Sequence, residues 1–297
     1  DRDKNRSSSR RSDKDSYKYI PYNNAGDYSN LLDTMLRNSN YADYGGKGVK
    51  NISPPGKEPQ VIDVRSNPYI VDVCVYILPR VDTSLVTEAT VRNQFAQASS
   101  KWGIDFVPTF HDLRTSNRAE DNIILDKDDL RESPPDRDNP EGGGATANLQ
   151  RVFNDLRGRF GCPNNLAVYY VPNDEFPPTN DGFVAAGRTY YSGTSTADIV
   201  LTKKSYDPLY NLTPQQLAQN LRYDPASVPT HEFGHALFYS GSANRQDPEY
   251  NPNDPEQRSV KHNTLPDNVM NYKTGALYKY SLTARQIAAA RNSPLVR

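Results

Sequence analysis

The sequence predicts an α/β domain built on a twisted, mostly parallel sheet of five strands. Runs of apolar, β-branched and aromatic residues alternate with segments whose apolar residues recur at helical spacing. Such strand–helix–strand units place their strands parallel and adjacent through a right-handed crossover. Only 35% of the residues are hydrophobic and the mean hydropathy is −0.82, which indicates one compact domain with long polar loops.

The first unit predicts a strand at 69–78 (YIVDVCVYIL), a helix at 86–103 and a second strand at 104–110. The helix is amphipathic, because its apolar residues at 91, 95, 98 and 102 share one face. Residues 113–146 are polar and rich in turn residues, so we expect a surface insertion there. A second amphipathic helix follows at 147–161. The remaining strands are predicted at 165–172, 182–191 and 197–203.

Residues 1–60 begin with DRDKNRSSSRRSDKDS, a mixed-charge, serine-rich run without an apolar period. Within them, YSNLLDTMLRNS predicts one short helix. We expect a polar, disordered tail or linker here, and a folded domain at 61–297. An attachment segment or a pro-segment is the functional alternative for the tail.

Charge and composition narrow the classes of partner. The formal net charge of −1 and the pI near 6.5 provide no field that would attract nucleic acid or an anionic membrane. The longest apolar run contains Asp72 and is too short to span a bilayer. Cys74 and Cys162 could form one disulfide in a secreted protein or remain buried thiols.

One segment has the sequence VPTHEFGHALFYSGS and contains two of the chain's four histidines, His231 and His235. On a helix, side chains four residues apart lie on one face, so both rings can bind one metal ion at about 2.0–2.1 Å. Glu232 then lies beside the ion and can take a proton from a metal-bound water. Ser227 is the predicted N-cap of this helix and Gly241 its end. The structural alternative is a helix that carries two histidines at this spacing by coincidence.

A catalytic zinc usually has three protein ligands and one water. The candidates for the third ligand all lie downstream of the helix: His262, Glu249, Glu256, Asp247 and Asp254. The fourth histidine, His111, follows a predicted strand, and we interpret it as a surface or loop residue, with a second, structural metal as the alternative.

The segment KHNTLPDNVMNY, taken together with HEFGH, resembles the metzincin clan of zinc metallopeptidases. The resemblance implies that His262 is the third ligand and that Met270 lies in a methionine-containing turn (the Met-turn) beneath the metal. It also implies that Tyr272, two residues after the methionine, stabilises the oxyanion formed from the scissile carbonyl.

The chain departs from the common clan motif HExxHxxGxxH. The glycine and third histidine of that motif would fall at positions 238 and 241, where this chain has Phe238 and Gly241. His262 comes 27 residues after His235 instead. Leishmanolysin-like members of the clan also carry a long insertion before the third histidine, so this spacing has a precedent.

The resemblance covers about residues 68–295 and is to the clan as a whole. It implies a metzincin-like fold in which the sheet has an antiparallel edge strand, an active-site helix and a C-terminal helix, the last matching LTARQIAAARNS. An edge strand can bind an extended peptide by ladder hydrogen bonds. The residues in its place are Phe183, Val184, Ala185, Ala186 and Gly187.

Together these features predict a zinc-dependent endopeptidase with one catalytic Zn²⁺ and a protein or peptide substrate, its catalytic domain spanning 61–297. The ion would be bound by His231, His235 and His262, while Glu232 would take the proton of the attacking water. One alternative is a thermolysin-like peptidase with Glu256 as third ligand. Another is a zinc-binding protein or toxin component of a larger assembly without general proteolytic activity. We expect a secreted protein, with a delivered effector or a cytoplasmic protein as alternatives.

Overall fold

The chain divides into two compact units, residues 1–66 and 67–297. The computed structural model describes residues 50–51, 61–62, 68–131, 144–162, 166–178, 184–192, 196–219, 223–238, 247–249, 253, 268–271 and 281–297. In the first unit, the strands β1 (Lys50–Asn51) and β2 (Val61–Ile62) pair antiparallel. β1 lies within the segment predicted to be a polar tail.

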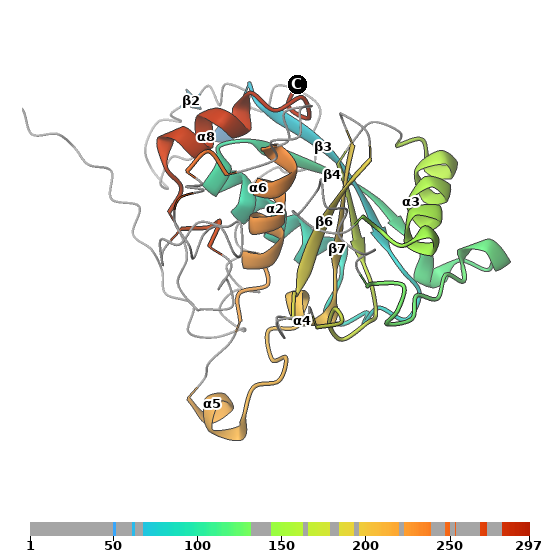
Figure 1. The fold of residues 1–297 in the computed structure, drawn as a ribbon. Helices are drawn as coiled ribbons and strands as arrows, with labels where there is room; N and C mark the ends of the chain where they lie inside the picture. The colour runs from blue at the N-terminus through green and yellow to red at the C-terminus, as the bar shows by residue number, and fades with distance from the viewer. Residues whose placement is uncertain are drawn as a thin grey trace, which may run out of the picture. The chain divides into compact units, whose positions relative to one another are not determined.

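The second unit contains a five-stranded sheet with the strand order β4-β3-β5-β7-β6 (Figure 1). Its strands are β3 (Ile70–Ile77), β4 (Asp105–Asp112), β5 (Leu166–Tyr170), β6 (Gly187–Ser192) and β7 (Thr196–Leu201). Four of them are parallel, whereas β6 runs antiparallel to β7 at one edge. The predicted α/β class is confirmed at this level, as a mostly parallel five-stranded sheet with an antiparallel edge strand.

Helices cover both faces of this sheet (Figure 1). The described helices are α2 (Glu88–Trp102), α3 (Ala147–Phe160), α4 (Lys203–Tyr206), α5 (Pro214–Ala218), α6 (Ser227–Leu237) and α8 (Ala284–Arg291). Of these, α5 lies apart from the sheet (Figure 1). On the face of α2 and α6, Phe233 stacks on Phe106 of β4 with ring centroids 4.2 Å apart. On the face of α3, Phe153 contacts Tyr169 of β5 at 4.7 Å. No helix among the described residues is long and apolar enough to cross a membrane.

Local sequence signals set the ends of the two long helices. The hydroxyl of Thr87 accepts a hydrogen bond from Thr90 N at 3.1 Å, and the Thr90 hydroxyl accepts from Thr87 N at 2.9 Å, which forms a capping box for α2. Gly103 ends α2 at φ 60° and Gly161 ends α3 at φ 73°. Glycine adopts this left-handed backbone at no steric cost, and both glycines lie at the ends of the predicted helices.

The predicted strand at 182–191 begins only at Gly187. Two carbonyl groups of the preceding residues accept hydrogen bonds from the segment that follows β7. The Ala186 oxygen accepts from Thr202 N at 3.1 Å, and the Val184 oxygen accepts from Lys204 Nζ at 3.1 Å. A side-chain pattern cannot predict this, because the contacts use backbone carbonyls that every residue carries.

The predicted N-cap of α6 is wrong by one residue. The N-cap is Ala226, and no side chain caps this end of the helix. Ser227 is the first helical residue, and its hydroxyl donates to the Asp224 carbonyl at 2.8 Å. The serine hydroxyl therefore fastens the preceding turn rather than the first N–H groups of the helix.

The polar insertion predicted at 113–146 contributes to the core where the structure describes it. It contains two short 3-10 turns, η1 (Leu113–Thr115) and η2 (Ala119–Asp121), and buries Leu125 and Leu130. Leu125 ends the apolar run NIIL, where we expect the insertion to be partly ordered. Leu130 stands alone among charged residues, so the sequence pattern did not indicate its burial.

A disulfide and a buried ion pair join the end of α3 to the sheet. Cys74 of β3 is bonded to Cys162, so the structure takes the disulfide rather than the free-thiol alternative. Arg157 donates to Asp198 of β7 at 2.8 Å, and the Tyr169 hydroxyl donates to the same carboxylate oxygen at 2.9 Å. Burial raises the pKa of Asp198, and the guanidinium and phenol bonds oppose that rise.

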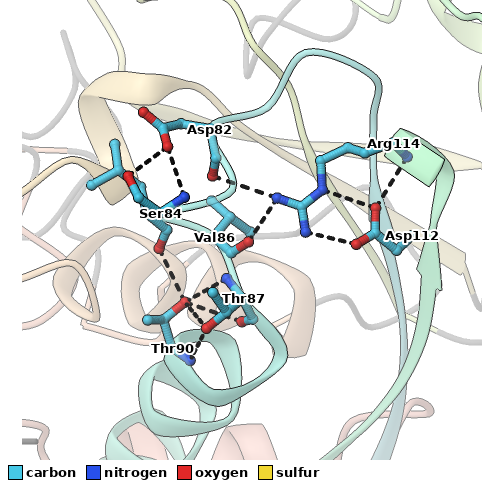
Figure 2. A network of polar contacts seen from close by, with 8 residues as sticks. Asp82, Ser84, Val86, Thr87, Thr90, Asp112 and Arg114 are labelled. Carbon is cyan, nitrogen blue, oxygen red and sulfur yellow. Dashed lines mark hydrogen bonds and ion pairs between the residues drawn. The ribbon is translucent and has the colours of Figure 1, made fainter.

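Figure 2 shows how one arginine fastens the loop before α2 to the end of β4. Arg114 donates from Nη1 to the Val86 carbonyl at 2.8 Å, and from Nε and Nη2 to the two carboxylate oxygens of Asp112 at 2.9 and 2.6 Å. Asp82 turns the loop itself, because its carboxylate accepts from both the amide and the hydroxyl of Ser84. The loop is thus held from both ends.

Replacing Arg114 by alanine should lower the free energy of unfolding by about 2 kcal/mol, since it removes charge-assisted hydrogen bonds from a side chain only 12% exposed. Arg114→Lys should recover only part of this loss, because an ammonium group cannot form the two parallel bonds to Asp112. Urea denaturation of the three proteins checks this prediction. Equal stability of Arg114→Lys and the wild type would show that only the charge matters.

Candidate metal centre

The helix α6 packs closely against Trp102 and Met270 along the segment HEFGH. The indole Nε1 of Trp102 donates to the Thr230 carbonyl at 3.0 Å, which joins the end of α2 to α6. A Cβ on Gly234 would overlap Sδ of Met270 and come within 2.7 Å of the Trp102 ring. Only glycine fits at this point, so the helix turn between the two histidines lies directly against the methionine.

The rings of His231 and His235 converge on one point from this helix. Their Nε2 atoms lie 3.0 Å apart. Nδ1 of His231 lies 2.8 Å from the Val269 carbonyl oxygen. Since a carbonyl only accepts, Nδ1 carries the proton and the Nε2 lone pair of His231 points toward His235.

This donor set fits a zinc ion. Two imidazole nitrogens 3.0 Å apart can both lie about 2.0–2.1 Å from one ion. A ligand histidine typically donates its other ring N–H to a carbonyl or carboxylate, which fixes the tautomer and the ring orientation. The Val269 carbonyl provides that partner for His231.

Glu232 lies beside the two histidines in a buried position, 5% exposed. The Thr189 hydroxyl of β6 donates to Glu232 Oε2 at 2.7 Å. Gly187 packs so closely that an added Cβ would lie 3.0 Å from Glu232 Cγ. Burial raises the pKa of Glu232 to about 7, against the lowering effects of the Thr189 bond and the positive charge of Arg188. A carboxylate with such a pKa can accept and return a proton near neutral pH.

Met270 is buried beneath α6, in a turn formed by residues 268–271. Asn268 Oδ1 accepts from Met270 N at 2.9 Å, and Asn271 N donates to the Asn268 carbonyl at 3.0 Å. The turn therefore presents the Met270 side chain to Gly234 and the carbonyl of Val269 to His231.

Several predicted site residues lie outside the described residues: His262, Tyr272, Phe183, Glu256 and Asp254. Their roles stay predictions. Among the described residues, no aspartate, glutamate, histidine or cysteine joins His231 and His235 in a group of three possible ligands.

The two described acids among the candidates for the third ligand are bound to α8 or to the turn before it. Asp247 Oδ2 accepts from Gln286 Nε2 at 2.7 Å. Glu249 Oε1 accepts from the Thr283 hydroxyl at 2.7 Å. Neither carboxylate lies with the two imidazoles among the described groups.

The predicted substrate-binding residues lie at the start of the edge strand. Val184, Ala185 and Ala186 precede β6, and only Gly187 belongs to it. Ala185 is buried at 9% exposure, while Val184 and Ala186 are half-buried. Their role in substrate binding stays a prediction, but the strand that could pair with a peptide is Gly187–Ser192.

A second cluster of possible metal ligands joins Cys74, His111 and Cys162 on the α3 face. The two sulfurs are bonded to each other, so neither is the thiolate that a metal would need. His111 lies within β4, half-buried, and stacks on Tyr76 at 5.1 Å. The interpretation of His111 as a surface or loop residue is therefore wrong, because the strand extends two residues beyond its predicted end.

A scan against models of known protein families finds no match for this chain, and a search of curated proteins finds no similar sequence. The function is therefore inferred from the geometry of the site.

Sequence patterns did not indicate three groups of the site. Thr189 is an ordinary strand residue, and only its position on the face toward α6 brings it to Glu232. Val269 contributes a carbonyl, which has no side-chain signal. The contact between Asn268 and Gln286 joins two uncharged amides from separate segments, and composition does not single them out.

Proposed function

We propose that this chain is a zinc-dependent endopeptidase of the metzincin type. His231, His235 and His262 would hold the ion. The observation that carries the proposal is the 3.0 Å convergence of the Nε2 atoms of His231 and His235, with Nδ1 of His231 bound to the Val269 carbonyl. Ligand histidines typically donate the other ring N–H to a carbonyl in this way, which fixes the tautomer and turns Nε2 toward the ion.

The residues around the ion have separable tasks. A bound zinc would supply Lewis acidity, which makes a water a better nucleophile and polarises the scissile carbonyl. Glu232 takes the proton of the attacking water and returns it to the leaving amine. Thr189 holds the carboxylate in place from the edge strand. Tyr272, if it follows the clan resemblance, donates to the developing oxyanion.

The disulfide supports a location in an oxidising compartment, which agrees with secretion. Disulfides persist outside the cytosol and are rare within it. Cys74 and Cys162 are 88 residues apart and their bond closes a large part of the domain.

The proposal predicts that the purified chain binds one zinc and that His262→Ala binds it more weakly, because a ligand is lost. His111→Ala is the matched control, since it removes the histidine that lies with the disulfide on the α3 face. The measurements are zinc content after dialysis and cleavage of casein, with and without a chelator. Cleavage should stop on chelation and return with zinc.

Two other results of these measurements would each favour a different function. Zinc held unchanged by His262→Ala would move the third ligand to the acids at 254 and 256 and favour the thermolysin-like site. A zinc-loaded wild type that cleaves neither casein nor a peptide library would favour a zinc-binding protein without proteolytic activity.

A further inference from the structure

Three polar side chains form a buried cluster between α8 and the turn that carries Met270. Asp247 is 5% exposed, Asn268 1% and Gln286 0%. Burying polar groups is unfavourable unless their hydrogen bonds are satisfied, so a cluster of this kind is stable only in a specific geometry. We call these three residues the amide cluster.

The hydrogen bonds of the amide cluster leave little freedom to its members. Asn268 Nδ2 donates to Gln286 Oε1 at 2.9 Å, and Gln286 Nε2 donates back to Asn268 Oδ1 at 3.0 Å. The second Nε2 hydrogen of Gln286 is directed to Asp247 Oδ2 at 2.7 Å. This reciprocal pair fixes the plane of the Asn268 amide.

The orientation of Asn268 determines where the next carbonyl points. Its Oδ1 accepts from Met270 N at 2.9 Å, which closes a turn around Val269. The Val269 amide also donates to the Ser281 carbonyl at 3.0 Å. The Val269 carbonyl is thereby held 2.8 Å from Nδ1 of His231.

We propose that Gln286, together with Asp247, is a positioning residue for the metal ligand His231, acting through Asn268 and the Val269 carbonyl. The inference rests on the proposed metal site. It adds that a side chain of α8 contributes to the affinity of this site for zinc. Groups that orient a ligand in this way typically change metal affinity by about 10–100-fold when they are removed.

A purely structural role is the competing explanation. Gln286 also completes the capping box of α8. Its Oε1 accepts a hydrogen bond from Thr283 N at 2.9 Å, and its backbone N donates one to the Thr283 hydroxyl. Loss of the cap would lower stability without a specific effect on the metal. Gln286→Glu separates the two roles. Glutamate keeps the acceptor for the cap, but it has no N–H donor for Asn268 and repels Asp247.

The chain offers a matched control for this substitution. Gln216 occupies the same position in the capping box of α5, where its Oε1 accepts from Thr213 N at 2.8 Å. Gln216→Glu therefore makes the same chemical change at a helix with no buried residue. Asp247→Asn combined with Gln286→Glu restores a donor–acceptor pair between positions 247 and 286, but it leaves Asn268 Oδ1 facing a carboxylate oxygen that cannot donate to it.

The experiment measures the dissociation constant for Zn²⁺ by competition with a chelating dye, and the visible spectrum of the Co²⁺-substituted protein, at one fixed pH. Gln286→Glu should bind Zn²⁺ about 10–100-fold more weakly and show an altered Co²⁺ spectrum. Gln216→Glu should match the wild type, whereas the double variant should stay as weak as Gln286→Glu, because the bond to Asn268 is not restored. Thermal unfolding of the metal-free proteins reports stability separately.

Wild-type affinity and an unchanged Co²⁺ spectrum in Gln286→Glu overturn the positioning role and leave the proposed function intact. A double variant that returns to wild-type affinity also overturns it, because the bond to Asn268 would then not matter. If Gln286→Glu does not fold, Asn268→Asp replaces it, because this change removes the donor to Gln286 and keeps the acceptor for Met270. A wild-type chain that binds no zinc overturns both proposals.

Discussion

Replacing Glu232 by glutamine should lower kcat/KM for peptide cleavage by about 10²–10⁴-fold while zinc stays bound. Glutamine has nearly the same shape and its Oε1 can still accept the Thr189 hydroxyl, which lies 2.7 Å from Glu232 Oε2. The amide cannot take a proton from water, so the general base is lost and the packing is kept.

The comparison needs zinc content and kcat/KM on the same preparations. Glu88→Gln is the control, because it makes the same change on a side chain that is 65% exposed at the start of α2. Glu88→Gln should be fully active. Activity within a few-fold of the wild type for Glu232→Gln would show that another group acts as the base.

Gly234→Ala should destabilise the protein by about 3 kcal/mol, although the same substitution stabilises most helices. The added Cβ would overlap Sδ of Met270 and approach Trp102, and both side chains are fully buried. Gly158→Ala is the control, since nothing lies within 4 Å of the Cβ that it adds to α3. That variant should be more stable than the wild type by up to about 1 kcal/mol.

A double-mutant cycle assigns the clash to the methionine. Met270→Ala alone should cost about 2–5 kcal/mol because it leaves a cavity. Combined with Gly234→Ala it should cost less than the sum, by about 1 kcal/mol or more, because the new Cβ occupies part of that space. Urea unfolding of the metal-free wild type, the two single variants and the double variant measures the four free energies of the cycle. Strict additivity would mean that the two residues do not touch.

The sheet could be predicted because a strand buried on both faces is a continuous apolar run. The runs around Val73, Val168 and Ile199 have this form, and each forms a strand of the sheet. The two long amphipathic helices were equally clear from the spacing of their apolar residues. The start of β6 at Gly187 was not, because it depends on contacts made by backbone carbonyls.

Only those residues of the candidate site could be predicted whose side-chain type and spacing indicate metal binding or proton transfer. His231, Glu232 and His235 stand out by residue type and spacing, and Met270 by resemblance. The geometry that orients them could not be inferred, because it depends on groups of no distinctive type, such as the Val269 carbonyl. Long-range contacts between uncharged amides have no local period from which they could be found.

The position of Val269 in the chain determines when, during synthesis, its carbonyl can contact His231. Val269 lies 38 residues beyond His231 in the chain, and Gln286 follows 18 residues after Asn268. Because a nascent chain emerges from the ribosome N-terminus first, the helix that carries the histidines emerges well before the groups that orient them. A nascent chain that has reached only α6 carries the two histidines without this carbonyl partner. The contact between His231 and Val269 therefore forms only after the turn at 268–271 and α8 have been synthesised and docked.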